Sequence, residues 1–179
     1  MYKKIHFVVA VILFFLISCS QVKREEIKPE KIDVKEIKAR AEETSNAFVS
    51  GDHQKVVDLT YPKLMEIMGG RAKMISFVEQ QMKELKTQGF EFVSSSVDDP
   101  REVVASDSQF FSIVPYTLKM KTPRGVMTQQ SYLLAISNKD TIKWSFIDVT
   151  GLEESQVKMV VPDALGKVTF PKKQPPVFE

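Results

Sequence analysis

The stretch Phe110-Phe-Ser-Ile-Val-Pro-Tyr-Thr-Leu-Lys-Met120 decides the fold class of this chain. Apolar residues recur at alternate positions along it, and this period of two is typical of a half-buried β-strand. The apolar face of the expected strand carries Phe110, Val114, Tyr116, Leu118 and Met120. A turn signal, Pro123-Arg-Gly125, comes directly after it, so the chain is expected to return as an antiparallel neighbour.

The same alternation predicts further strands on both sides of this stretch. They are expected at 90–92, 103–105, 126–137 and 142–148. In the strand over 126–137, Tyr132, Leu134 and Ile136 are in phase. In the strand over 142–148, the residues in phase are Ile142, Trp144, Phe146 and Asp148. Asn138-Lys-Asp140 is the turn signal between the last two. The sequence therefore predicts an antiparallel meander with one apolar face.

Helical patterns precede the strands. A capping box at Asp33 and Glu36 predicts a first helix, which Gly51 ends. Asp52 caps a short second helix, Pro62 opens a further turn, and residues 71–88 form the clearest amphipathic helix. A second capping box, Thr150 with Glu153, predicts a short helix to Val160. Three helices followed by a meander give an α+β domain, with the sheet curling around the helices.

Two stretches resemble the nuclear-transport-factor-2-like (SnoaL-like) superfamily. Phe48-Val-Ser-Gly-Asp-His-Gln-Lys-Val-Val-Asp-Leu-Thr60 is similar to the end of its first helix, its Gly-Asp turn and its second helix. Lys143-Trp-Ser-Phe-Ile-Asp148 is similar to its final strand. The resemblance covers about residues 32–150. It implies a cone in which three N-terminal helices pack in the concave face of a strongly curved, mostly antiparallel sheet.

The N-terminal residues carry an export signal. Lys3 and Lys4 precede an apolar run that is too short to span a bilayer, and the run ends in Leu16-Ile-Ser-Cys19. This motif resembles the lipobox of bacterial lipoproteins, which implies a signal peptide over 1–18 and a membrane anchor on lipidated Cys19, the only cysteine. An ordinary secretory signal with a chance cysteine is the alternative. Ser20, which is not Asp, favours the outer membrane in a host with two membranes.

The composition of the chain after the signal limits its class and its partners. The signal holds two of the 25 basic residues and none of the 23 acidic ones, so the remaining chain is balanced and no nucleic-acid partner is expected. Residues 19–31 are predicted to form a flexible charged tether or, alternatively, a short charged helix. Residues 32–161 suit one packed domain, and residues 162–179, with four prolines, are expected to lie extended along it or to hang free.

The residues that carry acid–base chemistry in isomerases of this superfamily are not in place. Counting from Asp52 puts the donor near Thr44 and the base near Met68, and Glu66 is the nearest carboxylate. His53 is either an exposed first-turn residue or a base paired with Asp52. The chain after the signal has one histidine and no cluster of carboxylates at ligand spacing, so neither a metal nor another cofactor is expected.

Asp148 and four aromatic residues are the remaining site candidates. Asp148 either points into the cone as an acid or base, or bonds backbone amides where the strand has ended. Tyr61, Tyr116, Tyr132 and Trp144 either line a ligand cavity or belong to the core.

Three functions compete on these observations. The first is a non-catalytic, membrane-anchored envelope lipoprotein that binds a small apolar ligand or a protein partner. The second is an enzyme that uses Asp148 and the cavity tyrosines. The third is a structural subunit that forms a homodimer through the sheet face, although the outward residues are polar, namely Thr117, Lys119, Lys121, Thr128 and Gln130. The missing acid–base pair favours the first.

Overall fold

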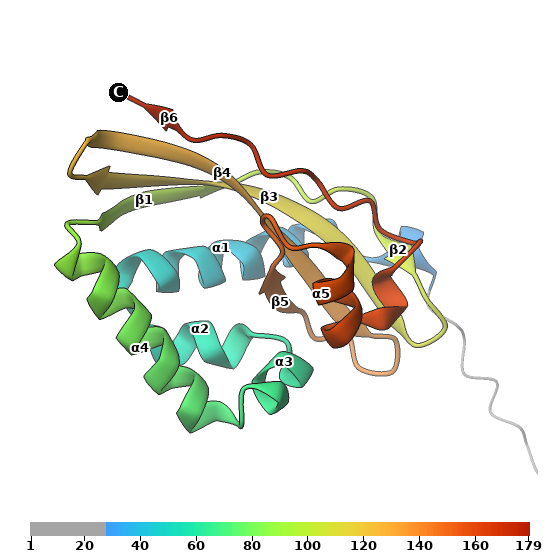
Figure 1. Cartoon of the computed structure of the whole chain (residues 1–179). Helices are drawn as coiled ribbons and strands as arrows, with labels where there is room; N and C mark the ends of the chain where they lie inside the picture. Colours follow the sequence, from blue (N-terminus) through green and yellow to red (C-terminus); the bar gives the residue numbers. More distant parts are fainter. Residues whose placement is uncertain (1–27) are drawn as a thin grey trace, which may run out of the picture.

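A curved antiparallel sheet lies over a layer of four helices (Figure 1). The structure is a computed structural model, and it describes residues 28–179. The expected signal peptide, Cys19 and most of the expected tether lie outside these residues. The α+β class and the antiparallel order are confirmed, and the sheet does not close into a barrel.

The helical layer precedes the sheet in the chain. It consists of α1 (Val34–Ser50), α2 (His53–Leu59), α3 (Pro62–Ile67) and α4 (Arg71–Thr87), after a 3₁₀ turn at Pro29–Lys31. Asp33 and Asp52 cap α1 and α2 by accepting backbone N–H bonds. Between these helices Gly51 has a φ of 75°, a left-handed conformation that favours glycine. The sequence pattern predicts only a turn where α3 forms.

The sheet has the strand order β1-β3-β4-β5, and all pairs between these strands are antiparallel. Two short strands add to it, β2 on β3 and β6 on β4. The bounds are β1 (Glu91–Val97), β2 (Val104–Ala105), β3 (Gln109–Thr122), β4 (Gly125–Asn138), β5 (Ser145–Asp148) and β6 (Val177–Phe178). β5 is shorter than expected because the Lys143 N–H donates to the Ser137 hydroxyl at 2.9 Å, outside the ladder.

Pro115 lies in the middle of β3, where a proline is unusual. Its carbonyl accepts the Asp98 N–H at 2.9 Å, just beyond the end of β1. In an antiparallel strand the N–H and C=O of one residue point to the same side. The N–H that Pro115 lacks would therefore also point toward β1, where the ladder has already ended. The ladder to β4 continues past Pro115 without a break. Pro115 therefore marks the point where β1 leaves the sheet, and pairing on that side resumes at β2.

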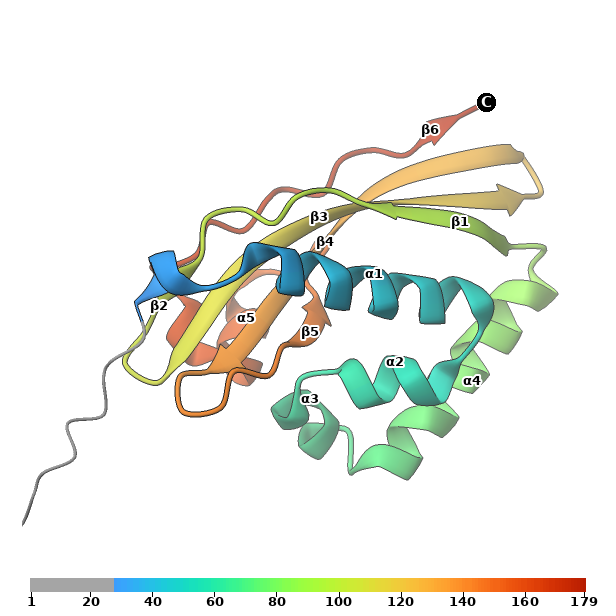
Figure 2. The same cartoon turned by 180° about the vertical axis from the view of Figure 1, so that it is seen from behind.

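The sheet is apolar on both faces, so the expectation of one apolar face is wrong. The concave face packs against α1 through a cluster that includes Ile37, Ala41, Phe110, Val114 and Phe146 (Figure 2). The opposite face packs against α5 (Glu154–Val160) and the turn after it, through Phe111, Ile113, Leu134, Val157 and Ala164 among others. Two cores, one on each face, therefore hold the sheet in place.

The polar cap of α5 differs from the prediction. Glu153 and Gln156 form the capping box of α5. The Thr150 hydroxyl instead accepts the Tyr132 N–H at 2.8 Å, which ties the chain after β5 to β4.

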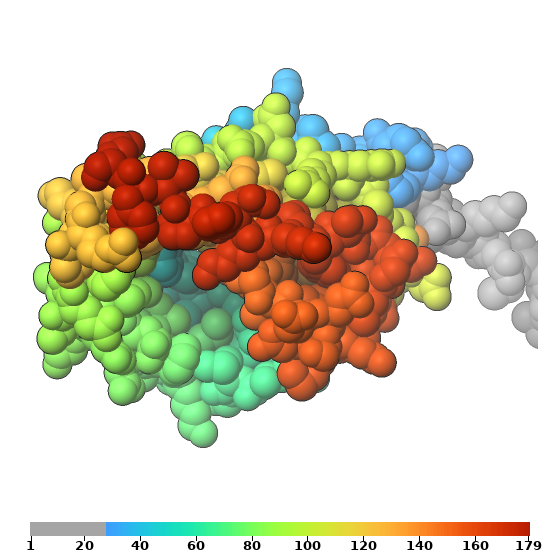
Figure 3. Space-filling model, turned by 45° about the horizontal axis from the view of Figure 1, so that its top comes forward, coloured from blue at the N-terminus to red at the C-terminus, as the bar shows by residue number. Residues whose placement is uncertain are grey.

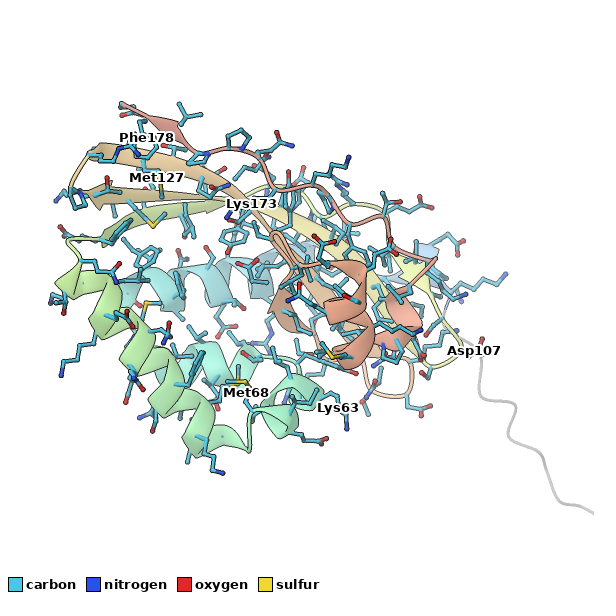
Figure 4. All side chains as sticks on the ribbon, in the orientation of Figure 1. Lys63, Met68, Asp107, Met127, Lys173 and Phe178 are labelled. Carbon is cyan, nitrogen blue, oxygen red and sulfur yellow. The ribbon has the colours of Figure 1, made fainter. Side chains whose placement is uncertain are left out.

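The C-terminal segment lies extended across the sheet, as Figure 3 shows in red. It passes along the edge of β4 beyond β5, where Gln129, 8% exposed, donates to the Gln174 carbonyl at 3.0 Å. At its end Phe178 pairs with Met127, and both side chains are labelled at the tip of the sheet in Figure 4. Of the two expected arrangements of this segment, the structure has the one along the domain.

Candidate functional site

A cavity of about 290 Å³ lies between part of the helical layer and the concave face of the sheet. All four helices and strands β3, β4 and β5 contribute to its wall, and most of the wall is apolar, from Phe48, Val56, Leu64, Met74, Leu118, Leu133 and Phe146. In Figure 3 the surface is hollowed between the green atoms of α4 and the orange atoms after β5, beneath the red C-terminal segment. The fold thus leaves an apolar space between its layers.

Most polar groups on this wall are already bonded within the protein. The hydroxyls of Thr44 and Thr60 donate to the carbonyls of Arg40 and Val56 one helical turn earlier, each at 2.9 Å. Ser45 on α1 bonds Ser95 on β1. These hydroxyls therefore add little polarity to the cavity.

Tyr116 and Asp148 form the polar end of the cavity. The Tyr116 hydroxyl donates to Oδ2 of Asp148 at 2.6 Å, and the Thr150 N–H donates to Oδ1 at 2.8 Å. Tyr116 comes from the middle of β3 and Asp148 from the last residue of β5, and β4 lies between them in the sheet. Asp148 thus lines the cavity and also bonds a backbone amide, whereas its role as an acid or base stays a prediction.

Burial differs sharply between the two partners. Tyr116 is 5% exposed, whereas Asp148 is exposed to solvent. Burial raises the pKa of Tyr116 well above its ordinary value of 10.0, and the neighbouring Asp148 carboxylate raises it further. The phenol therefore stays protonated at neutral pH and directs its proton at Asp148.

The other predicted ligand-binding residues are not part of this cavity. Tyr132 lies on the opposite face of the sheet, where Arg101 lies 5.9 Å above its ring. Tyr61 and Trp144 line a separate cleft of about 500 Å³ between α3 and the β4–β5 turn, together with charged side chains such as Asp58 and Lys63. Trp144 is 2% exposed and packs mainly in the concave core. Of the five predicted residues, only Tyr116 and Asp148 come together in the cavity between the layers.

The positions counted from Asp52 do not form an acid–base pair. Thr44 lines the cavity, but Met68 does not, and Glu66 is an exposed partner of Lys63 at 3.2 Å. The Asp52 carboxylate caps α2 by accepting the Lys55 N–H, and the half-buried His53 lines a different cleft, together with Glu79 and Lys86. Within residues 28–179, no group of three or more His, Cys, Asp and Glu side chains is placed to hold a metal ion.

Sequence reasoning missed several wall residues, above all Leu133. It lies out of phase with Tyr132, Leu134 and Ile136, which alternation predicts as the apolar face of β4 and which instead face the second core. The uninterrupted apolar run from 132 to 136 is the signal that could have revealed it, because a strand buried on both faces loses its alternation.

Ion pairs hold the helices that frame the cavity. Glu43 on α1 pairs with Lys55 on α2 and with Arg40 at 2.7 Å, and these hydrogen bonds hold the pKa of the Glu43 carboxyl below its ordinary range. Arg71 at the start of α4 binds both oxygens of Asp58 on α2, at 2.6 and 3.0 Å. The helical layer is thus linked by charge as well as by apolar contact.

Comparisons with protein-family models, with curated proteins and with solved structures found no match. No helix within residues 28–179 has both the length and the apolar character to cross a membrane.

Proposed function

We propose that this protein is a membrane-anchored envelope lipoprotein whose domain binds a small apolar ligand without transforming it. The observation that carries the proposal is the apolar cavity between the helices and the concave face. Its volume of about 290 Å³ lies just below the range of roughly 300–1,000 Å³ that is usual for ligand sites. Such a cavity suits a ligand of small size.

The anchor and the fold family complete the proposal. The lipobox-like Leu16-Ile-Ser-Cys19 supports lipidation at Cys19, and Ser20 favours an outer-membrane address where the host has two membranes. Helices packed in the hollow of a curved antiparallel sheet support the nuclear-transport-factor-2-like cone as the fold. In this proposal, the tether holds the cavity near the membrane surface, where apolar molecules concentrate.

The binding proposal is tested by filling the cavity. Val56 is half-buried on α2 and lines the cavity, so Val56→Phe adds about four carbon atoms to its interior. Calorimetric titration of the full chain in detergent with 2-phenylethanol, with detergent alone as the blank, should show binding that Val56→Phe abolishes. Val93→Phe is the matched control, because Val93 is 45% exposed on β1 and does not line the cavity. An equal effect of both variants, or no binding by the unaltered chain, would reject the proposal.

An acid–base enzyme is a second candidate, and the hydrogen bond from Tyr116 to Asp148 is the observation that favours it. A carboxylate and a neutral phenol at one end of an apolar cavity are groups that proton-transfer enzymes use. The tyrosines at 61 and 132 do not join them, which leaves this candidate with a smaller set of convergent groups. Release of a modified product from a bound ligand, lost in Asp148→Asn, would favour this candidate over simple binding.

A further inference from the structure

Asp148 is the only charged side chain among the described residues that line the cavity. It is held from two sides, by the Tyr116 hydroxyl and by the Thr150 N–H. A carboxylate offers about four lone-pair positions, so about half of its accepting capacity remains for a ligand. These two hydrogen bonds fix the orientation of the carboxylate and leave some of its lone pairs free to accept hydrogen bonds from a ligand.

No cationic side chain within residues 28–179 forms an ion pair with this carboxylate. The ion pairs of Lys and Arg side chains in this part of the chain involve other acids. Tyr116 cannot supply a proton to a ligand as well, because its single hydroxyl proton is directed at Asp148 and its pKa is raised. The polar end of the cavity therefore accepts hydrogen bonds and carries one negative charge.

The rest of the cavity wall determines which chemical groups the remainder of the ligand can carry. The Thr44 and Thr60 hydroxyls are bonded to helix carbonyls, and the other neighbours are mostly apolar. Because Asp148 is exposed to solvent, a cation bound there keeps part of its hydration and avoids the cost of a fully buried ion pair. The charged group of the ligand thus belongs at the cavity mouth and its apolar body inside.

We infer that the ligand class is an apolar primary amine, whose ammonium group binds the Asp148 carboxylate while its hydrocarbon part fills the cavity. This inference rests on the proposed function and adds the charge and chemistry of the ligand. A charge-assisted bond from an ammonium group is stronger than one from a neutral hydroxyl, and a carboxylate ligand would be repelled. The cavity therefore discriminates between ligands of one shape by their charge.

Three probes of similar shape test the inference on the full chain in detergent at pH 7. The probes are 2-phenylethylamine, 2-phenylethanol and 3-phenylpropanoate, and calorimetry measures the dissociation constant of each. The amine should bind about 10-fold more tightly than the alcohol, and the carboxylate more weakly than both. This comparison needs no variant. Equal affinity for amine and alcohol would overturn the inference and leave the binding proposal standing, whereas no binding of any probe would overturn both.

A pair of variants then assigns the preference to one carboxylate. Asp148→Asn keeps the shape of the side chain and removes its charge, so the ratio of amine to alcohol affinity should fall from about 10 to about 1. Asp107→Asn is the matched control, because Asp107 is exposed on the loop before β3, away from the cavity (Figure 4), and it should keep the full preference. An Asp148→Asn protein that melts like the unaltered chain and still prefers the amine would contradict the inference.

Discussion

Removal of the Tyr116 hydroxyl tests whether the hydrogen bond to Asp148 stabilises the fold. Tyr116→Phe keeps the ring in the concave core and deletes the hydroxyl, which donates the 2.6 Å bond to Asp148 and also has a hydrogen bond with Ser131. A hydrogen bond to a charged group contributes about 1.5–3 kcal/mol, and water can reach the exposed Asp148 after the change, so we expect a loss near the lower end, about 1.5 kcal/mol. For a domain of this size that corresponds to a fall in melting temperature of about 3–6 °C.

A double-mutant cycle isolates the bond from other effects of the change. Urea unfolding of the unaltered chain, Tyr116→Phe, Asp148→Ala and the double variant should give a coupling free energy of about 1 kcal/mol. The Thr150 N–H bond is lost in both Asp148 variants and so cancels from the cycle. Additivity of the two single changes to within about 0.3–0.5 kcal/mol would refute the reasoning.

The same substitution should change the stability at high pH. Since burial raises the pKa of Tyr116 in the folded state, the unfolded chain loses this proton first as the pH passes the ordinary value of 10.0. The stabilisation is therefore complete below pH 10 and is lost as the pH rises toward the folded-state pKa. The difference in unfolding free energy between the unaltered chain and Tyr116→Phe should shrink between pH 8 and pH 11. A constant difference would contradict the direction of the pKa shift.

Three further outcomes are expected. Cys19→Ser should block lipid attachment, and fractionation should no longer find processed protein in the membrane; complete membrane retention after processing would oppose the anchor. Deletion of residues 172–179 should uncover the β4 edge near Gln129, so sedimentation should detect self-association, whereas a monomer at high concentration would mean that the edge needs no cover. Glu43→Gln should lower the unfolding free energy by about 0.5–1 kcal/mol at pH 7, because the pKa of Glu43 is depressed by Lys55 and Arg40. The stabilisation by the carboxylate is lost as the pH falls from its ordinary pKa of 4.5 through the lowered pKa of the folded state, so the difference in unfolding free energy between the two proteins should shrink with falling pH. A difference that stays constant would speak against these ion pairs.

Local patterns predicted most elements of the fold. The left-handed Gly51, the caps at Asp33 and Asp52 and the alternation along β3 depend on neighbours in the sequence, and the structure has each of them. Turn residues at 123–125 likewise placed the β3–β4 hairpin correctly. Such features follow from backbone preferences and hydrophobic period, which a sequence carries directly.

Which predicted residues meet in the cavity depends on strand register and on contacts between distant segments, and neither can be read from neighbouring residues in the sequence. Tyr116 and Tyr132 are both in strand phase, but Tyr132 pairs with Pro115, so the register of the hairpin puts the two rings on opposite faces. The sequence did not predict the second core. The prolines after Val160 indicate an extended tail, but Ala164, in that segment, is fully buried in this core. Asp148 could be predicted because it continues the phase of Phe146, but its partner required the tertiary structure.

The position of Pro115 matters before the chain has folded. Runs of about five to seven apolar, β-prone residues without proline are the segments through which unfolded chains aggregate. In β3 such a run begins at Phe110, and Pro115 interrupts it before Tyr116 and Leu118 can extend it. In the export proposed here, the chain would expose this segment before it folds. For a chain exported in this way, we expect the proline at the end of the β1 ladder also to limit aggregation before folding.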